Sequence, residues 1–229
     1  MKKLALGLLL AASSLVNAET FFKDQSLTLL QGNDYELGDN ERVVVTYEYL
    51  SVHDWGDVFG FVDRLIDQNN GDAETYIEVS PNFNLMTFES GLVNSVKLAT
   101  TWEMNETDDQ FLLGLGAGLN LPGFSNFSVS AYQRFNDSGE DNQQVTFVWG
   151  LPFNIAGQDF MFDGFWDFET DLKDTTSSNF TPQLKWDMAK LVGYDNKLYV
   201  GVEYVMWNDK FHVEGVDENN VNLLLKAHF

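Results

Sequence analysis

The sequence predicts an all-β protein, a 12-stranded antiparallel transmembrane β-barrel, from three observations. In the last stretch, 219–229, the apolar residues Val221, Leu223 and Leu225 alternate with polar ones, with Leu224 as the exception, and the chain ends on Phe229. A strand turns alternate side chains to opposite faces, so one face of this stretch is apolar and the other polar. Eleven earlier stretches repeat the pattern. Tryptophans and tyrosines lie on the apolar faces, several near strand ends, as at a membrane interface.

The beginning of the chain has the pattern of a secretory signal peptide. It opens on Met1-Lys2-Lys3, continues with an apolar run over 4–16 and reaches a small-residue cleavage site at Ala18. We therefore expect a signal peptide at 1–18 and an outer-membrane β-barrel at 19–229. The chain contains no cysteine, which excludes a lipid anchor on cysteine and any disulfide framework.

Composition excludes several classes of protein. With 35 acidic against 13 basic residues, the formal net charge is -22, and such a surface repels nucleic acid. Aromatic residues make up 14% of the chain, too many for a disordered acidic protein. Acidity alone is also typical of an ordinary soluble secreted chain.

The first four strands are expected where hydrophobic residues alternate with polar ones between turn-forming segments. In the second strand, Val43, Val45 and Tyr47 share a face opposite Glu48. In the fourth strand Pro81 removes one ladder hydrogen bond, so we expect a bulge there. The expected ranges are 26–31, 43–52, 58–63 and 76–85.

The middle strands carry the same alternation. In the sixth, leucines alternate with Gly114, Gly116 and Gly118, and glycines confined to one face indicate an inner wall that stays open or bends sharply. A Leu-Pro-Gly turn at 121–123 leads into the seventh strand. The expected ranges are 94–103, 111–121, 127–134 and 143–153.

The last four strands complete an even count, as a bacterial barrel requires. Phe160, Phe162 and Trp166 alternate with acidic residues in the ninth, and Val200 and Val202 with Gly201 and Glu203 in the eleventh. The expected ranges are 158–170, 180–188, 198–207 and 219–229.

The connections predict an orientation. Those after odd-numbered strands are longer and acidic, as outward loops are, whereas most of the others are short turns. Both ends of the mature chain then lie on the periplasmic side. The acidic loops lack the spacing of a calcium loop, so a solvated rim is expected. The outward loops are 32–42, 64–74, 104–110, 136–142, 171–179 and 208–218.

Two stretches resemble a known family. They are Thr46-Tyr-Glu-Tyr-Leu-Ser-Val-His-Asp-Trp-Gly-Asp-Val-Phe-Gly-Phe-Val-Asp63 and Tyr76-Ile-Glu-Val-Ser-Pro-Asn-Phe83. They are similar to the Tsx and OmpK family of nucleoside-specific outer-membrane channels, and the hairpin at 121–135 looks like that family's next shared region. The resemblance implies a monomeric twelve-stranded barrel whose narrow pore passes nucleosides and deoxynucleosides without energy coupling. The residues that it carries over are Glu48, Asp54, Trp55, Asp57, Phe59, Gly60, Phe61, Asp63, Glu78 and Pro81.

A pore selective for nucleosides needs aromatic rings that stack on the base and polar groups that bind the ribose. The polar faces of the strands supply both kinds of side chain. The same charged residues are equally expected in a salt-bridge network that fills a small barrel, and this alternative stays open. The expected pore lining is Glu48, Phe59, Phe61, Tyr76, Glu78, Tyr132, Arg134, Asp163, Phe165, Asp167, Lys185, Tyr199 and Glu203.

Other functions are weighed on the same residues. A general small-solute pore and a phage or adhesion receptor remain alternatives to nucleoside uptake. An enzyme is not expected, because His53 and His228 are placed at the periplasmic side and His212 lies in a loop with no serine close in sequence. No cofactor and no metal site are expected. The expected partners are nucleosides, outer-membrane lipid and lipopolysaccharide, and the barrel-assembly machinery through Phe229, with no nucleic acid.

Overall fold

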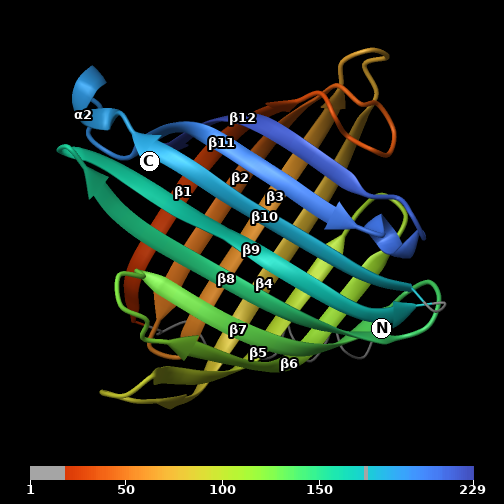
Figure 1. Cartoon of the computed structure of the whole chain (residues 1–229). Helices are drawn as coiled ribbons and strands as arrows, with labels where there is room; N and C mark the ends of the chain where they lie inside the picture. The colour runs from red at the N-terminus through yellow and green to blue at the C-terminus, as the bar shows by residue number, and fades with distance from the viewer. Residues whose placement is uncertain (1–18, 173–174) are drawn as a thin grey trace.

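The first and last strands pair with each other and close a single barrel (Figure 1). The computed structural model describes residues 19–172 and 175–229, so the predicted signal peptide lies outside the described residues. The predicted antiparallel barrel of twelve strands is confirmed. The strands are β1 (Thr20–Gly32), β2 (Arg42–His53), β3 (Gly56–Asp67), β4 (Ala73–Thr87), β5 (Val93–Met104), β6 (Asp109–Leu119), β7 (Asn126–Asn136), β8 (Asn142–Ile155), β9 (Gln158–Leu172), β10 (Thr175–Asp187), β11 (Leu198–Asn208) and β12 (Glu218–His228).

Several strands extend further than the sequence suggested. The loop expected at 171–179 is wrong, because β9 continues to Leu172 and β10 already begins at Thr175. β3 likewise continues to Asp67. About 9–11 residues cross a bilayer in a tilted strand, so strands of 15 residues such as β9 continue their pairing beyond it. At the end of the barrel where β9 is connected to β10, the strands therefore stay paired beyond the length needed to cross the bilayer.

Within residues 19–172 and 175–229, helical structure is confined to two connections. α2 (Ala189–Val192) lies between β10 and β11, and the short 3-10 helix η1 (Lys210–His212) lies between β11 and β12. No helix in the described part of the chain has the length and apolarity needed to cross a membrane.

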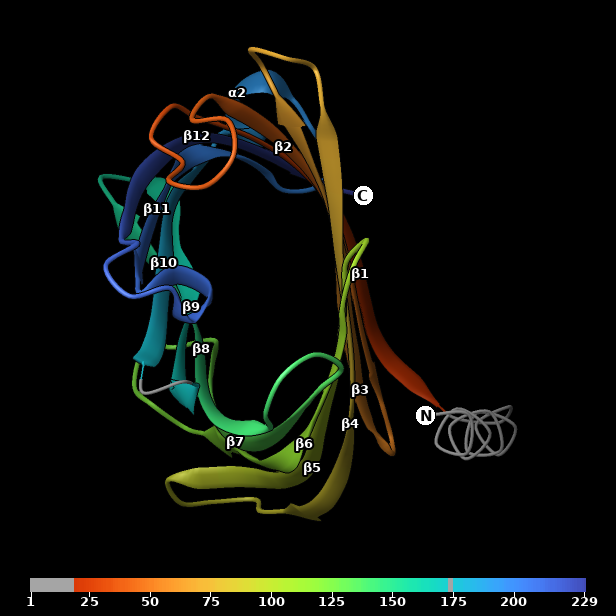
Figure 2. The same cartoon turned by 90° about the vertical axis from the view of Figure 1, so that its right-hand side faces the viewer.

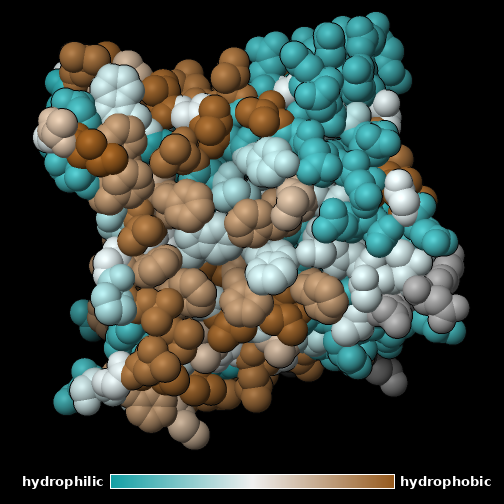
Figure 3. Space-filling model, viewed as in Figure 1, coloured by the Kyte–Doolittle hydropathy of each residue, from teal (hydrophilic) through white to brown (hydrophobic). Residues whose placement is uncertain are grey.

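The alternation in β12 separates an apolar outer face from a polar inner face. Val221, Leu223 and Leu225 are 53%, 65% and 45% exposed, whereas the intervening positions on the inner face, Asn220, Asn222 and the apolar exception Leu224, are buried. The space-filling view shows apolar residues over the left and lower parts of the wall, while the upper right part is hydrophilic (Figure 3). Water would not favour so large an apolar surface, and lipid would.

Aromatic residues form a continuous patch on the outer face of β8–β10. The Trp149 ring stacks on Phe180 at 5.6 Å between centroids, and Phe147 stacks on Trp166 at the same distance. Gly164 makes room for this packing: a Cβ there would lie 3.0 Å from the Trp149 ring and 2.3 Å from the Thr181 carbonyl oxygen. The alternating aromatic residues of β8 and β9 thus build part of the outer surface.

Glycine allows β6 to follow a tight bend. Figure 2 shows the barrel as an elongated ring, with β5, β6 and β7 at a strongly curved end. A Cβ at Gly114 would lie 1.8 Å from the carbonyl oxygen of Ala131 on β7, so no larger residue fits without a backbone shift. Of the two roles expected for these glycines, the structure favours the bend.

The bulge expected at Pro81 is wrong. Pro81 keeps its register opposite Val58, and the Thr100 hydroxyl donates to its carbonyl oxygen. The irregularity in β4 lies instead between Asn84 and Met86. The Thr100 hydroxyl thus satisfies the carbonyl oxygen of Pro81 itself, and the strand keeps its register without an inserted residue.

We predict that Gly114→Ala lowers the free energy of unfolding of the barrel by about 1–3 kcal/mol, because the added methyl group overlaps backbone. Gly116→Ala is the matched control, since its Cβ meets only the movable Ser130 hydroxyl closely, at 2.8 Å. Unfolding in urea, followed by tryptophan fluorescence in detergent micelles, measures both variants. Equal stability of the two variants would contradict this explanation of the bend.

Candidate functional site

The inner wall of the barrel holds every residue of the predicted pore lining. Directly paired residues share a face, and one such row runs from Glu48 through Phe61 and Glu78 to Glu103. A second row joins Asp163, Gln183, Glu203 and Asn222 across β9–β12. Asn222 is buried on the inward face of β12, which fixes the direction of this row. These registers place the expected residues on the inward face, while their contact with a substrate stays a prediction.

Three of the predicted aromatic residues form a row on β3 and β4. The ring centroids of Phe59 and Phe61 lie 6.1 Å apart, and those of Phe61 and Tyr76 lie 5.8 Å apart. The Tyr76 hydroxyl donates to Glu78 at 2.7 Å. Ring faces beside a carboxylate can bind a flat solute that carries hydroxyl groups. Tyr132 and Phe165 stand elsewhere on the inner wall, on β7 and β9.

Arg134 connects five strands of the wall. Its guanidinium on β7 lies 3.0 Å from Glu103 on β5 and 3.3 Å from Glu169 on β9, and it donates to Gln110 on β6 at 2.8 Å. It also bonds to Gln144 on β8. A planar guanidinium presents several donors at fixed angles, which suits such a hub. Arg134 therefore fixes the shape of the strongly curved side.

Lys185 and Lys226 organise the opposite side. Lys185 binds Asp163 at 2.6 Å and lies 5.5 Å from the centroid of the Tyr199 ring. Lys226 on β12 pairs with Glu48 on β2, spanning β1. The expected residues thus fall into an aromatic row, the Arg134 hub and this lysine group rather than into one cluster.

The loop between β1 and β2 folds inward, which the sequence reasoning missed. Tyr35 is only 8% exposed and donates its hydroxyl to Asn222 at 2.9 Å. The backbone N–H groups of Asp34 and Glu36 donate to Asn220 and Glu218 of β12. Burial raises the pKa of the Tyr35 hydroxyl, which therefore keeps its proton at neutral pH. A lone aromatic residue in this acidic loop was the signal for an inward fold.

The loop between β11 and β12 is attached to the wall by His212. The two ring nitrogens lie 2.7 Å from the Thr175 carbonyl oxygen and 3.0 Å from the Glu169 carboxylate. Both partners are acceptors, so both nitrogens must donate and the ring must carry a proton on each. Burial opposes that charge, but the bonds to Glu169 and Thr175 outweigh it and raise the pKa of His212 above its ordinary value.

This attachment holds a strained backbone. Asp209, Phe211 and His212 have φ angles of 44°, 56° and 57°, in the left-handed region. Each such residue costs about 1–3 kcal/mol, so surrounding contacts must offset it. The Phe211 ring packs edge-on against Trp207 at 4.6 Å, and Lys210 binds Glu218 at 2.5 Å. The contacts of His212, Phe211 and Lys210 together therefore hold the loop against the ends of the neighbouring strands.

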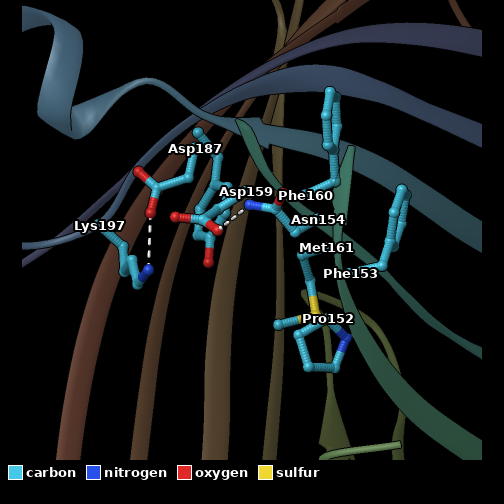
Figure 4. Close-up of a pocket in the computed structure, with 9 residues that line it drawn as sticks. Pro152, Phe153, Asn154, Asp159, Phe160, Met161, Asp187 and Lys197 are labelled. Carbon is cyan, nitrogen blue, oxygen red and sulfur yellow. Dashed lines mark hydrogen bonds and ion pairs between the residues drawn. The ribbon is translucent and has the colours of Figure 1, made fainter. Parts of the chain in front are cut away.

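At the other end of the barrel lies a cavity of about 470 Å³. Figure 4 shows Lys197 facing Asp187 at one side, with Asp159 beside Asn154 and the rings of Phe153 and Phe160 stacked side by side. The Lys197–Asp187 distance is 2.7 Å. Every polar contact drawn joins two lining residues, so the polar groups of this cavity are already paired with one another. In the described ranges no group of three or more acidic or histidine side chains is placed to hold a metal ion.

Comparison with known proteins supports the fold. No protein-family model matches the sequence, and no curated protein matches it. Among solved structures, the chain is similar to one described as "KdgM porin", with a TM-score of 0.56 and 7% sequence identity. The match covers 91% of this chain and 99% of that one. At this identity the likeness concerns the architecture of the barrel.

We predict that the loop 209–217 detaches as the pH rises. The raised pKa means that the stabilisation by His212 is complete below its ordinary value, about 6.5, and is lost as the pH rises through the raised value. Amide hydrogen exchange of the loop, corrected for the intrinsic effect of pH, measures this between about pH 5 and pH 9.

His53→Gln, at the opposite end of the barrel, serves as the control and should keep the pH dependence. His212→Gln should abolish it. Protection of the loop that does not change with pH in the unmodified protein would contradict a charged His212.

Proposed function

We propose that this protein is an outer-membrane channel through which small solutes, and nucleosides in particular, diffuse passively. The combination of an apolar outer wall and a charged inner wall supports a barrel in lipid with a polar interior. The fold is similar to that of a protein described as a porin, which supports the channel function. The asymmetric bacterial surface membrane, with its lipid and lipopolysaccharide, is the proposed surrounding.

One observation carries the nucleoside proposal: the row of Phe59, Phe61 and Tyr76 beside Glu78. A nucleoside combines a flat base with a ribose rich in hydroxyl groups and has no net charge. Rings bind the base by stacking, and a carboxylate accepts hydrogen bonds from ribose. The stretches 46–63 and 76–83, which resemble nucleoside channels, contain this row, and the resemblance carries over Phe59, Phe61 and Glu78. Motif and geometry therefore support the same substrate.

A general small-solute pore is the second candidate. It is favoured by the Arg134 hub, whose contacts brace the wall and need no particular solute. A receptor without transport is less supported, because the loops 33–41 and 209–217 bind the barrel wall instead of projecting as a free surface. The proposed processing at 1–18 and insertion by the barrel-assembly machinery through Phe229 suit all of these candidates.

We predict that nucleosides block the ion current of the refolded protein in a planar bilayer and that Tyr76→Ala weakens the block. Stacking on one ring is worth about 1–3 kcal/mol, so the half-blocking concentration should rise by about tenfold or more. Tyr132→Ala tests the other inward tyrosine in the same way, and a weaker block is again expected.

Tyr204→Ala is the matched control, because Tyr204 lies on the outer wall with its hydroxyl bonded to Asn219. It should leave the block unchanged. A neutral sugar of similar size that blocks as well as adenosine would favour the general pore. A block that is the same in Tyr76→Ala, Tyr132→Ala and the unmodified protein would contradict the aromatic site.

A further inference from the structure

The basic side chains on the inner wall are all neutralised by carboxylates, within residues 19–172 and 175–229. Each lysine or arginine that faces inward has an acidic partner in a salt bridge. The pairs are Arg42–Asp67, Lys97–Asp57, Arg134–Glu103, Lys185–Asp163 and Lys226–Glu48. Their positive charge is thus directed at the wall rather than at a passing solute.

Four inward carboxylates have no basic partner among the described salt bridges. Asp63 accepts from the Thr46 hydroxyl at 2.5 Å, and Glu78 accepts from Tyr76. Asp167 accepts from Gln144 at 3.0 Å, and Glu203 accepts from Gln183 at 2.7 Å. Hydroxyl and amide donors orient a carboxylate without cancelling its charge.

These four carboxylates face one another from two sides. Asp63 and Glu78 belong to β3 and β4, while Asp167 and Glu203 belong to β9 and β11. Figure 2 shows β3 and β4 on the long wall opposite β9–β11. Asp63 and Glu203 lie close enough to repel each other when both are ionised, as do Glu78 and Asp167. A solute between the two walls therefore meets carboxyl groups on both sides.

We propose that the passage selects cations and neutral solutes over anions, and that Asp63, Glu78, Asp167 and Glu203 determine this selectivity. The inference rests on the proposed channel function and adds the charge class of the solute. Unpaired acidic residues lining a pore attract cations, and low-dielectric walls strengthen the effect. Neutral solutes pass because binding to rings and hydroxyl acceptors requires no charge.

The test is the reversal potential of the refolded protein in a planar bilayer under a tenfold gradient of KCl, a ratio chosen to give a clear sign. We expect potassium to be preferred over chloride by about fivefold or more, the factor that one charge at about 4 Å contributes in water. The variant Asp63→Asn/Glu78→Gln/Asp167→Asn/Glu203→Gln should lose most of this preference. The double variants Asp63→Asn/Glu203→Gln and Glu78→Gln/Asp167→Asn should each lose part of it and provide data if the fourfold variant does not fold.

Glu89→Gln is the matched control, because Glu89 is an exposed carboxylate in the turn between β4 and β5. It should keep the reversal potential. Current without ion preference, a preference for chloride, or unchanged selectivity in the folded double variants would each overturn the inference. Each of these outcomes would overturn the ion selectivity only. Nucleoside block is measured separately, so the proposed channel function can stand without the ion selectivity. Absence of any current contradicts both.

Discussion

The pairing of β1 with β12 is the contact on which the whole structure depends. Backbone N–H and C=O groups inside a bilayer have no water to bind, so an open sheet edge there is strongly disfavoured. The register from Ser26↔His228 to Gln31↔Leu223 removes both edges at once. The leucines Leu27, Leu29, Leu223 and Leu225 along this seam are all about half exposed and face outward. Closure and lipid exposure are therefore two results of one strand pairing.

Closure also decides what the interior contains. Alternation places every second residue inside, and the barrel must curve tightly at β5–β7, where Gly114 leaves space for the neighbouring backbone. Charged groups in a narrow interior need partners, and Arg134 meets this need for several strands at once. The lumen thus obtains much of its rigidity from ion pairs and hydrogen bonds, beside a small apolar cluster of Leu30, Val44 and Leu224. The carboxylates outside these pairs are the groups left to act on a solute.

Sequence periodicity predicted the strands well because a side-chain period of two is a local property. It placed Glu78 and Glu203 on the inner wall, since a residue's face follows from its neighbours alone. It failed where contacts between distant segments decide the structure. The extension of β10 to Thr175 depends on pairing with β9, and the inward fold of Tyr35 depends on Asn222, far away in sequence. The role of His212 was missed for the same reason, because its acceptors belong to other strands.

The central claim is that this closed, internally paired barrel keeps an open polar passage. The most direct measurement is the single-channel current of the unmodified refolded protein in a planar bilayer, with salt alone on both sides. The account predicts discrete current steps of one uniform size. The twelve strands form one closed barrel with a single passage, and ion pairs keep the width of that passage constant. A folded, membrane-inserted protein that carries no current would contradict it, since the ion pairs would then fill the barrel instead of lining it.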